Sequence, residues 1–272
     1  MPPDIGGITR ANRRKLQTLH QRAKGPFTAH DAAAWLGVSQ ESARRLLAYL
    51  AERGWLVRVR RGLYVPVPLE SRHPGDWTED PWVVAARLFA PCYVGGWSAC
   101  EHWGLTDQLF RQLIVVTARR VRHRHEEVQG TPFRVKVLPR AKLFGTRSVW
   151  RNEVRVAVSD PSRTVVDLLD DPSMGGGMRL IAEILQEYFA GEHRAHAVLL
   201  DYIDNFGNRT VYKRLGYLVE SLGVNAPDLV RECLVRQSTG VSKLDPTVKS
   251  SGRTISRWRL DVNVTAGGQA ET

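Results

Sequence analysis

Two groups of side chains have the residue types of a catalytic centre, but each lacks a part that the chemistry needs. Gly96-Trp-Ser-Ala-Cys100 is similar to the nucleophile elbow of serine hydrolases, yet a cysteine stands where that motif has its last glycine. Ser98 and Glu101 also have the spacing of a capping box, so we predict that Ser98 begins a helix. The three aspartates between positions 167 and 171 lack the accompanying Glu-x-Lys strand of a nuclease. Neither group therefore predicts catalysis.

Candidate metal ligands and phosphate loops are incomplete as well. The histidines and cysteines lack the paired close spacing of a zinc site. They are Cys92, Cys100, His102, His123, His125, His193 and His196. The glycine run between Met174 and Met178 lacks the Lys-Ser/Thr pair of a phosphate-binding loop and predicts a flexible connection. We expect no catalytic residue, no metal and no cofactor, and hence a protein that is not an enzyme.

The remaining feature of the sequence that indicates a function is its positive charge. The 272 residues include 39 Lys+Arg and 28 Asp+Glu, a net charge of +11. Residues 1–66 hold twelve basic residues against four acids, and residues 117–151 hold ten against two. A hydrophobic share of 43% and a charged share of 25% exclude a disordered or fibrous chain. Such a folded, basic protein suits a polyanionic partner, nucleic acid before an anionic membrane.

The first basic stretch has the pattern of a winged helix-turn-helix. Residues 10–24 predict a helix that Gly25-Pro26 ends, and residues 29–36 predict a second, short helix. After a turn of about three residues, Ser39 would cap a third helix over residues 40–53. Its apolar stripe consists of Ala43, Leu46, Leu47 and Leu50. Residues 55–65 then predict two strands around Arg60-Arg61-Gly62, which would form a basic wing.

The third helix would read double-stranded DNA with the side that faces away from its apolar stripe. A recognition helix contacts base edges mainly from its N-terminal half, where arginine pairs with guanine and glutamine with adenine. The wing and the first helix would contact phosphates. The predicted DNA-binding residues are Ser39, Gln40, Ser42, Arg44, Arg45 and Tyr49 at the third helix, Arg58, Arg60 and Arg61 in the wing, and Arg13 and Arg14 in the first helix.

Beyond residue 80 the pattern mixes helices and strands. Residues 113–117, 133–138 and 154–158 predict strands of one sheet, and Asp160-Pro161 predicts a helix start. Residues 178–236 read as mostly helical and residues 255–262 as a last strand. The expected fold class is α+β, an N-terminal winged helix-turn-helix followed by a larger mixed α/β domain. That larger domain would have a mainly antiparallel sheet and a helical C-terminal part.

The second basic stretch leaves two interpretations open. Alternation in residues 133–137 places Arg134 and Lys136 on one face of a strand. This face is either the polar outside of a sheet or a basic surface for DNA, RNA or an acidic partner. The candidate residues for such a surface are Arg119, Arg120, Arg122, Arg134 and Lys136.

The positions of the prolines and the local composition predict the domain boundaries. We predict a winged domain over residues 1–68, a linker over residues 69–80, a second domain over residues 81–264 and a flexible tail over residues 265–272. No apolar run approaches the ~20 residues of a membrane-spanning helix, and the N-terminus has no apolar signal-peptide core. Three cysteines without paired spacing suit a reducing compartment. We expect a cytoplasmic protein without a membrane partner.

Three motifs, in this order, resemble the AbiEi family of antitoxins from type IV toxin-antitoxin systems. They are Arg60-Arg-Gly-Leu-Tyr64, Tyr93-Val-Gly-Gly-Trp-Ser-Ala-Cys-Glu-His-Trp-Gly-Leu105 and Ser159-Asp-Pro-Ser-Arg-Thr-Val-Val-Asp-Leu-Leu169. The likeness covers residues 10–225. It implies a winged domain that represses its own operon by binding inverted repeats, an arrangement that suits a dimer on DNA. It also implies that the second domain antagonises a cognate nucleotidyltransferase toxin, often without a stable complex.

Two other functions remain open on the sequence alone. The chain could be a nucleic-acid-processing enzyme that the winged domain targets, which predicts a change in the integrity of nucleic acid. It could also be a transcriptional regulator whose second domain senses a ligand, which predicts a DNA affinity that depends on that ligand.

Overall fold

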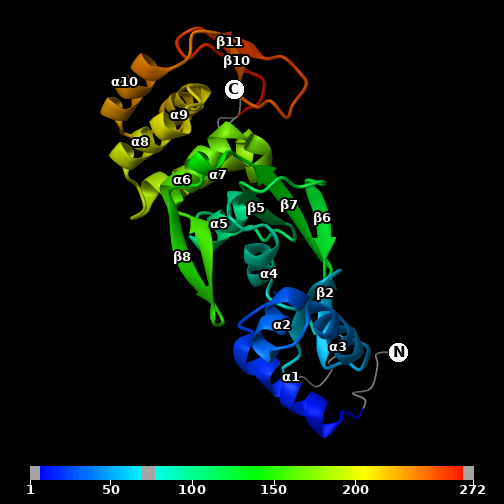
Figure 1. Ribbon diagram of the computed structural model, residues 1–272. Helices are drawn as coiled ribbons and strands as arrows, with labels where there is room; N and C mark the ends of the chain where they lie inside the picture. Colours follow the sequence, from blue (N-terminus) through cyan, green and yellow to red (C-terminus); the bar gives the residue numbers. More distant parts are fainter. Residues whose placement is uncertain (1–6, 69–76, 266–272) are drawn as a thin grey trace.

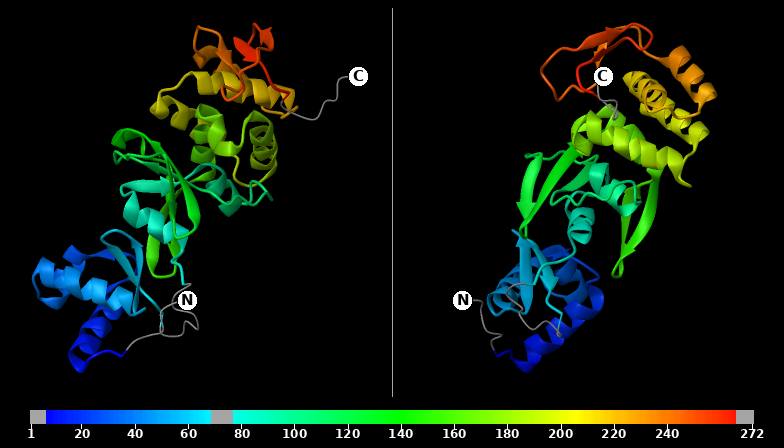
Figure 2. Two further views of the ribbon diagram at one scale, coloured as in Figure 1. Left: turned by 90° about the vertical axis from the view of Figure 1, so that its right-hand side faces the viewer. Right: turned by 180° about the vertical axis from the view of Figure 1, so that it is seen from behind.

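The structure is a computed structural model of the chain and describes residues 7–68 and 77–265. Figure 1 shows three stacked parts: a bundle of helices with a hairpin (blue to cyan), a central sheet, and a group of helices with a second, smaller sheet. The views in Figure 2 show the same order, with the first and third parts at opposite ends of an elongated molecule. Residues 69–76 of the predicted linker and 266–272 of the predicted tail lie outside the described residues.

The N-terminal part has the winged helix-turn-helix fold that the sequence predicts. Its elements are α1 (Arg10–Arg22), β1 (Phe27–Thr28), α2 (Ala29–Leu36), α3 (Gln40–Glu52), β2 (Leu56–Arg60) and β3 (Leu63–Pro66). Thr28 and Asp31 form a reciprocal capping box at the start of α2, and the Ser39 hydroxyl caps α3. The strands pair antiparallel in the order β1-β3-β2, so β2 and β3 form the predicted wing.

The apolar stripe of α3 fixes how this helix sits. Ala43, Leu47 and Leu50 are fully buried and join a cluster with Leu19 of α1 and Phe27 of β1. Because residues spaced three and four apart share one side of a helix, the opposite side of α3 is left in solvent.

The central part is built on one six-stranded sheet. Its elements are α4 (Pro81–Leu88), β4 (Cys92–Val94), α5 (Gly96–His102), β5 (Leu113–Thr117), β6 (His125–Val128), β7 (Thr131–Val137), the 3-10 helix η2 (Arg140–Lys142), β8 (Thr146–Arg151) and β9 (Val154–Ser159). The strand order is β6-β7-β5-β4-β9-β8, with β5/β7 and β4/β9 parallel and the other three pairs antiparallel. The strands predicted around residues 113–117, 133–138 and 154–158 share this sheet, which confirms the fold class.

Both faces of the sheet are covered by other elements. Leu113 and Val115 of β5 belong to a buried cluster with α4, whereas Ile114 and Val116 belong to a cluster with α6 and α7. Alternate residues of a strand point to opposite faces, so the sheet separates two cores.

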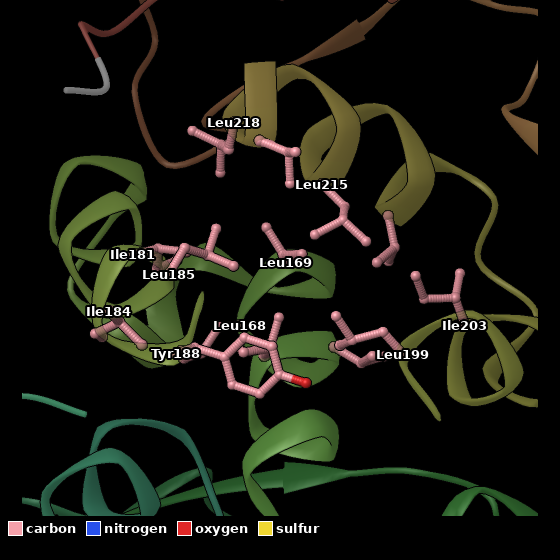
Figure 3. Close-up of a cluster of buried hydrophobic side chains, with 14 of the residues drawn as sticks. Leu168, Leu169, Ile181, Ile184, Leu185, Tyr188, Leu199, Ile203, Leu215 and Leu218 are labelled. Atoms are coloured by element: carbon pink, nitrogen blue, oxygen red, sulfur yellow. The ribbon is translucent and has the colours of Figure 1, made fainter. Parts of the chain in front are cut away.

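The third part is helical, as predicted for residues 178–236. Its helices are α6 (Pro161–Asp170), the 3-10 helix η3 (Pro172–Gly175), α7 (Met178–Ala190), α8 (His196–Phe206), α9 (Thr210–Ser221) and α10 (Pro227–Arg236). Asp160 caps α6 and Pro161 is its first residue, which confirms the predicted helix start. Figure 3 shows side chains of α6, α7, α8 and α9 converging, with Leu168, Leu185 and Leu215 among them.

The predicted single strand over residues 255–262 is wrong. The chain forms β10 (Ser242–Lys243), β11 (Arg253–Ile255) and β12 (Leu260–Val262), with β11 and β12 antiparallel around a turn. Trp258 in this turn is 1% exposed and lies against Gly216 of α9, where a Cβ atom would be 2.0 Å from the indole. The turn buries Trp258, and this is why one continuous strand does not form.

Two local predictions near glycines are also wrong. The N-cap of α5 is Gly95 and not Ser98, whose hydroxyl instead accepts a hydrogen bond of 3.0 Å from the Ile114 N–H. The glycine run before Met178 is a packed turn and not a flexible connection. A Cβ atom at Gly175 would meet the Leu168 side chain at 2.7 Å, and the Met178 N–H donates to Asp245.

The wing packs against the central part. One buried cluster includes Val59, Leu63 and Val65 of the wing together with Val84 and Leu88 of α4. Arg60 Nη1 lies 3.3 Å from Glu126 Oε1 in β6, and Arg87 of α4 pairs with Asp31 of α2. The apolar contacts and the Arg60–Glu126 pair hold the wing against the central part, and the Arg87–Asp31 pair joins α2 to it.

Candidate nucleic-acid interface

The solvent side of α3 carries the predicted base-reading residues. Of the eleven predicted DNA-binding residues, ten are exposed and Tyr49 is half-buried, so the set is accessible to a partner. The helix positions them because its apolar stripe faces the core and Ser39 fixes its first turn.

The residues of this side differ in how far their polar groups are already engaged. Ser39 accepts from the Ser42 N–H and donates to the Ser42 hydroxyl, so these two side chains serve the helix cap. Arg45 pairs with Glu41 at 3.4 Å, but both side chains are more than two-thirds exposed, at 73% and 77%, so water weakens this pair. Arg44 has no ion pair or side-chain hydrogen bond to any residue that the structure describes. Its guanidinium group is available for a partner.

Tyr49 has a structural partner. The Arg53 guanidinium lies 4.7 Å from the centre of its ring, and Arg53 in turn donates to the Gly7 carbonyl. This cation–π contact orients the half-buried ring at the C-terminal half of α3.

The wing lies beside α3 and presents two free arginines. Strand β2 packs against α3, and a register shift between Arg58 and Arg60 interrupts its pairing with β3. Arg58 and Arg61 are exposed and have no ion pair within residues 7–68 and 77–265. Arg60 differs because Glu126 neutralises it. Nothing in the sequence links Arg60 to Glu126, 66 positions away, so sequence reasoning missed this contact.

Arg13 and Arg14 lie on a different helix from the base-reading residues. Both are exposed on α1, which packs on α2, and α2 in turn packs on α3. The structure therefore places α3 beside the wing, and α1 joins them through α2 and through the shared buried cluster.

The second basic stretch divides into exposed and internally engaged residues. Arg120 and Arg122 are exposed in the loop after β5, and Arg119 donates to the Leu88 carbonyl at 2.7 Å. Arg134 donates to the carbonyl and hydroxyl of Ser173, and Lys136 lies 2.6 Å from Asp170 and 3.4 Å from Asp171.

Both interpretations of Arg134 and Lys136 need correction. The two residues share a strand face as predicted, but they lie in register with Ile114 and Val116, on the face that α6 and η3 cover. With only 16% of its side chain exposed, Lys136 is part of neither a polar outer face nor an open basic surface.

The aspartates between positions 167 and 171 serve the fold. Asp167 is fully buried, accepts from Arg163 Nε at 3.0 Å and accepts from the Tyr93 hydroxyl at 2.8 Å. Burial lowers the pKa of Arg163, but the charges and hydrogen bonds of Asp167 and Tyr93 together outweigh burial and raise this pKa above its ordinary value. Arg163 also lies 4.3 Å from the centre of the Phe144 ring. The Asp-Pro-x-Arg-Thr-x-x-Asp motif thus encodes a helix cap and a buried ion pair.

Ser98 and the three cysteines are engaged in packing. Ser98 is 5% exposed and holds the start of β5. Burial raises the pKa of Cys92 and of Cys233 to about 12, so both stay thiols at neutral pH. Within the described residues, no three His, Cys, Asp or Glu side chains are placed to hold a metal ion together. In the same residues, no helix is long and apolar enough to cross a membrane.

A comparison with known families identifies the N-terminal part. Residues 14–67 match the model of a family described as transcriptional regulator, AbiEi antitoxin. The match begins within α1 and ends after β3, so it spans the helix-turn-helix and the wing. No curated protein matches the chain. The motifs at residues 93–105 and 159–169 lie outside the matched segment, so their likeness to the family stays a prediction. The resemblance to the AbiEi family is confirmed over the winged domain, where residues 14–67 are similar to the transcriptional-regulator domain of AbiEi antitoxins.

Proposed function

We propose that this protein is an antitoxin and autorepressor that binds the DNA upstream of its own operon, with α3 in the major groove and the wing on the backbone. The observation that carries the proposal is the exposed side of α3, where Gln40 and Arg44 have no side-chain partner among the described residues. Desolvation of free donors costs less than breaking existing ion pairs, so these two residues are the best placed to read bases.

The wing would add affinity without sequence preference. Arg58 and Arg61 are exposed beside α3, and each phosphate contact by such a residue releases condensed counterions. We assign Arg60 a smaller part, because its guanidinium is already paired with Glu126.

A binding experiment with Arg44→Ala tests the DNA-binding half. Full-length protein is titrated onto its own upstream duplex and onto a scrambled duplex over a salt series, with fluorescence anisotropy as the readout. Loss of one base contact costs about 1–3 kcal/mol, so we expect affinity for the native duplex to fall about 5- to 150-fold, with little change on the scrambled one.

The matched control is Arg179→Ala, because Arg179 is an exposed arginine on α7 in the helical part. It should bind both duplexes like the unchanged protein. Equal binding of the unchanged protein to native and scrambled DNA would contradict the proposal, since the net charge of +11 would then bind nucleic acid without sequence preference.

We assign antagonism of a nucleotidyltransferase toxin to the second domain, supported by the resemblance of residues 93–105 and 159–169 to the family. Arg44→Ala separates the two activities when the full chain is co-expressed with the neighbouring toxin gene. It should lose repression of a promoter reporter and still rescue growth. Failure of the unchanged protein to rescue growth would overturn the antitoxin half and leave the DNA result standing.

The remaining parts of the proposal concern setting and assembly. Binding to inverted repeats would place two copies on one operator, and the protein would act in the cytoplasm. Cleavage or modification of DNA or RNA by the purified protein, with or without divalent metal, would instead favour the enzyme. A ligand that changes operator affinity, with no toxin gene beside this one, would favour the ligand-sensing regulator.

A further inference from the structure

A polar cleft opens on the central part, away from α3. It has a volume of about 550 Å³ and lies between the start of α4, the end of α5, the loop before β5 and the end of β8. Trp82, Glu101, His102, Phe110, Arg111 and Arg151 are the lining residues that matter here. A volume of this order suits a ligand the size of a nucleotide or a metabolite.

Three of the charged groups of this cleft are unpaired, whereas Asp80, which also lines it, caps α4 by accepting a hydrogen bond of 2.7 Å from the Trp82 N–H. Arg111, Arg151 and Glu101 form no ion pair and no side-chain hydrogen bond with residues 7–68 or 77–265. Lys136, Arg134 and Arg163 show the contrast, since each is engaged by a partner inside the fold. Two guanidinium groups on one cleft offer forked donors that match a carboxylate or a phosphate.

Aromatic side chains line the cleft beside these charged groups. The Arg151 guanidinium lies 4.3 Å from the centre of the Trp82 ring, and the His102 ring lies 5.4 Å from the same indole. Phe110 stacks on Trp97 at 4.7 Å with 9° between the ring planes, which holds the loop that carries Arg111. Burial and the charge of Arg151 lower the pKa of His102, so its ring is neutral at pH 7 and can donate or accept a hydrogen bond.

We propose that this cleft binds a small anion that carries a planar ring, with Arg111 and Arg151 on the anionic group and Phe110 beside the ring. Nucleotides and aromatic carboxylates share this chemistry. The site does not depend on DNA binding, because neither α3 nor the wing lines it.

Isothermal titration calorimetry of the full-length protein tests the site with four probes: ATP, CTP, salicylate and sodium pyrophosphate. We expect at least one ring-bearing anion to bind with a Kd below 1 mM, and pyrophosphate to bind at least 10-fold more weakly than that anion. The comparison of ATP and CTP with salicylate separates a nucleotide from an aromatic carboxylate. No binding below 1 mM for any probe, or equal binding of pyrophosphate, would overturn the proposal.

Three variants sharpen the result. Arg111→Gln removes an exposed charge that makes no bond within the described chain, so it should fold normally and weaken the best probe about 10-fold or more. Phe110→Ala should weaken ring-bearing probes and leave pyrophosphate unchanged. Arg120→Gln is the matched control, since Arg120 is exposed outside the cleft, and it should bind all probes like the unchanged protein. Equal losses in Arg111→Gln and Arg120→Gln would show a general charge effect and refute the site.

Discussion

Arginine and lysine side chains have different roles in the winged domain and in the second domain. In the winged domain Arg44, Arg58 and Arg61 extend into solvent without ion-pair partners among the described residues. In the second domain Lys136 and Arg163 face inward and are held by aspartates. Free cations on a surface attract a polyanion, whereas a buried cation with a hydrogen-bonded carboxylate holds elements together. A count of charges along the chain cannot distinguish the two roles.

The difference arises from what covers each element. Helix α3 lies at the edge of the molecule with one apolar stripe, so its charged side faces solvent. Strand β7 lies inside the six-stranded sheet, and α6 and η3 close over the face that carries Arg134 and Lys136.

Removing the buried cation should have the largest effect on stability. Arg163→Ala leaves the carboxyl of Asp167 fully buried, where burial already raises its pKa, and removes its ion pair, so we expect the free energy of unfolding to fall by about 3–5 kcal/mol. Urea unfolding followed by circular dichroism measures it. Arg44→Ala is the control and should change the unfolding free energy by less than about 0.5 kcal/mol. Equal stability losses in both variants would remove the distinction between the two regions.

A cavity in the shared core between the wing and α4 should have the next largest effect. Val59→Ala removes two buried methyl groups from a side chain that is 6% exposed, at a cost of about 2 kcal/mol. Arg58→Ala, on the exposed side of the same strand, should leave unfolding nearly unchanged and weaken DNA binding. If Val59→Ala were as stable as the unchanged protein, the wing would not be anchored through this core.

The two neighbouring arginines of the wing should differ in their effect on DNA binding. Arg61→Ala should reduce the slope of log affinity against log salt by about 0.9, the value for one lost phosphate contact. Arg60→Ala should reduce it by less, because Arg60 is paired with Glu126. Anisotropy titrations of both variants over a salt series measure the slopes. A larger change for Arg60 than for Arg61 would mean that DNA displaces Glu126.

The smallest effect should come from the ionic contact between α2 and α4. Burial raises the pKa of Asp31, but hydrogen bonds from Thr28 and the nearby Arg87 outweigh it and hold this pKa below its ordinary value of 3.8. A carboxylate with a lowered pKa stabilises the folded state above pH 3.8, and this contribution is lost as the pH falls below that value.

Asp31→Asn should therefore reduce stability slightly at pH 7, by at most about 1 kcal/mol for a partly exposed cap and ion pair. The difference from the unchanged protein should shrink as acid unfolding is approached. Urea unfolding at pH 7 and near pH 3.5 measures both values. A difference that stays constant over this range would show that the charge of Asp31 does not contribute.

The sequence by itself determined the local elements with strong patterns. The apolar stripe of α3, the cap at Ser39, the basic wing and the Asp160-Pro161 helix start were all predictable, because each depends on residues close together in the chain. The fold class followed from the same patterns. So did the resemblance to AbiEi antitoxins over the winged domain, because that domain is built from short-range motifs.

Only the tertiary structure decided which charges are free and which are used inside the fold. Arg60 meets Glu126 and Lys136 meets Asp170 across long sequence separations, and no local pattern predicts such pairs. Trp258 turns a predicted strand into a hairpin because Gly216, on a distant helix, leaves room for its ring. Side-chain type and spacing fix helices and strands, but the folding of remote segments onto one another fixes what each charged group faces.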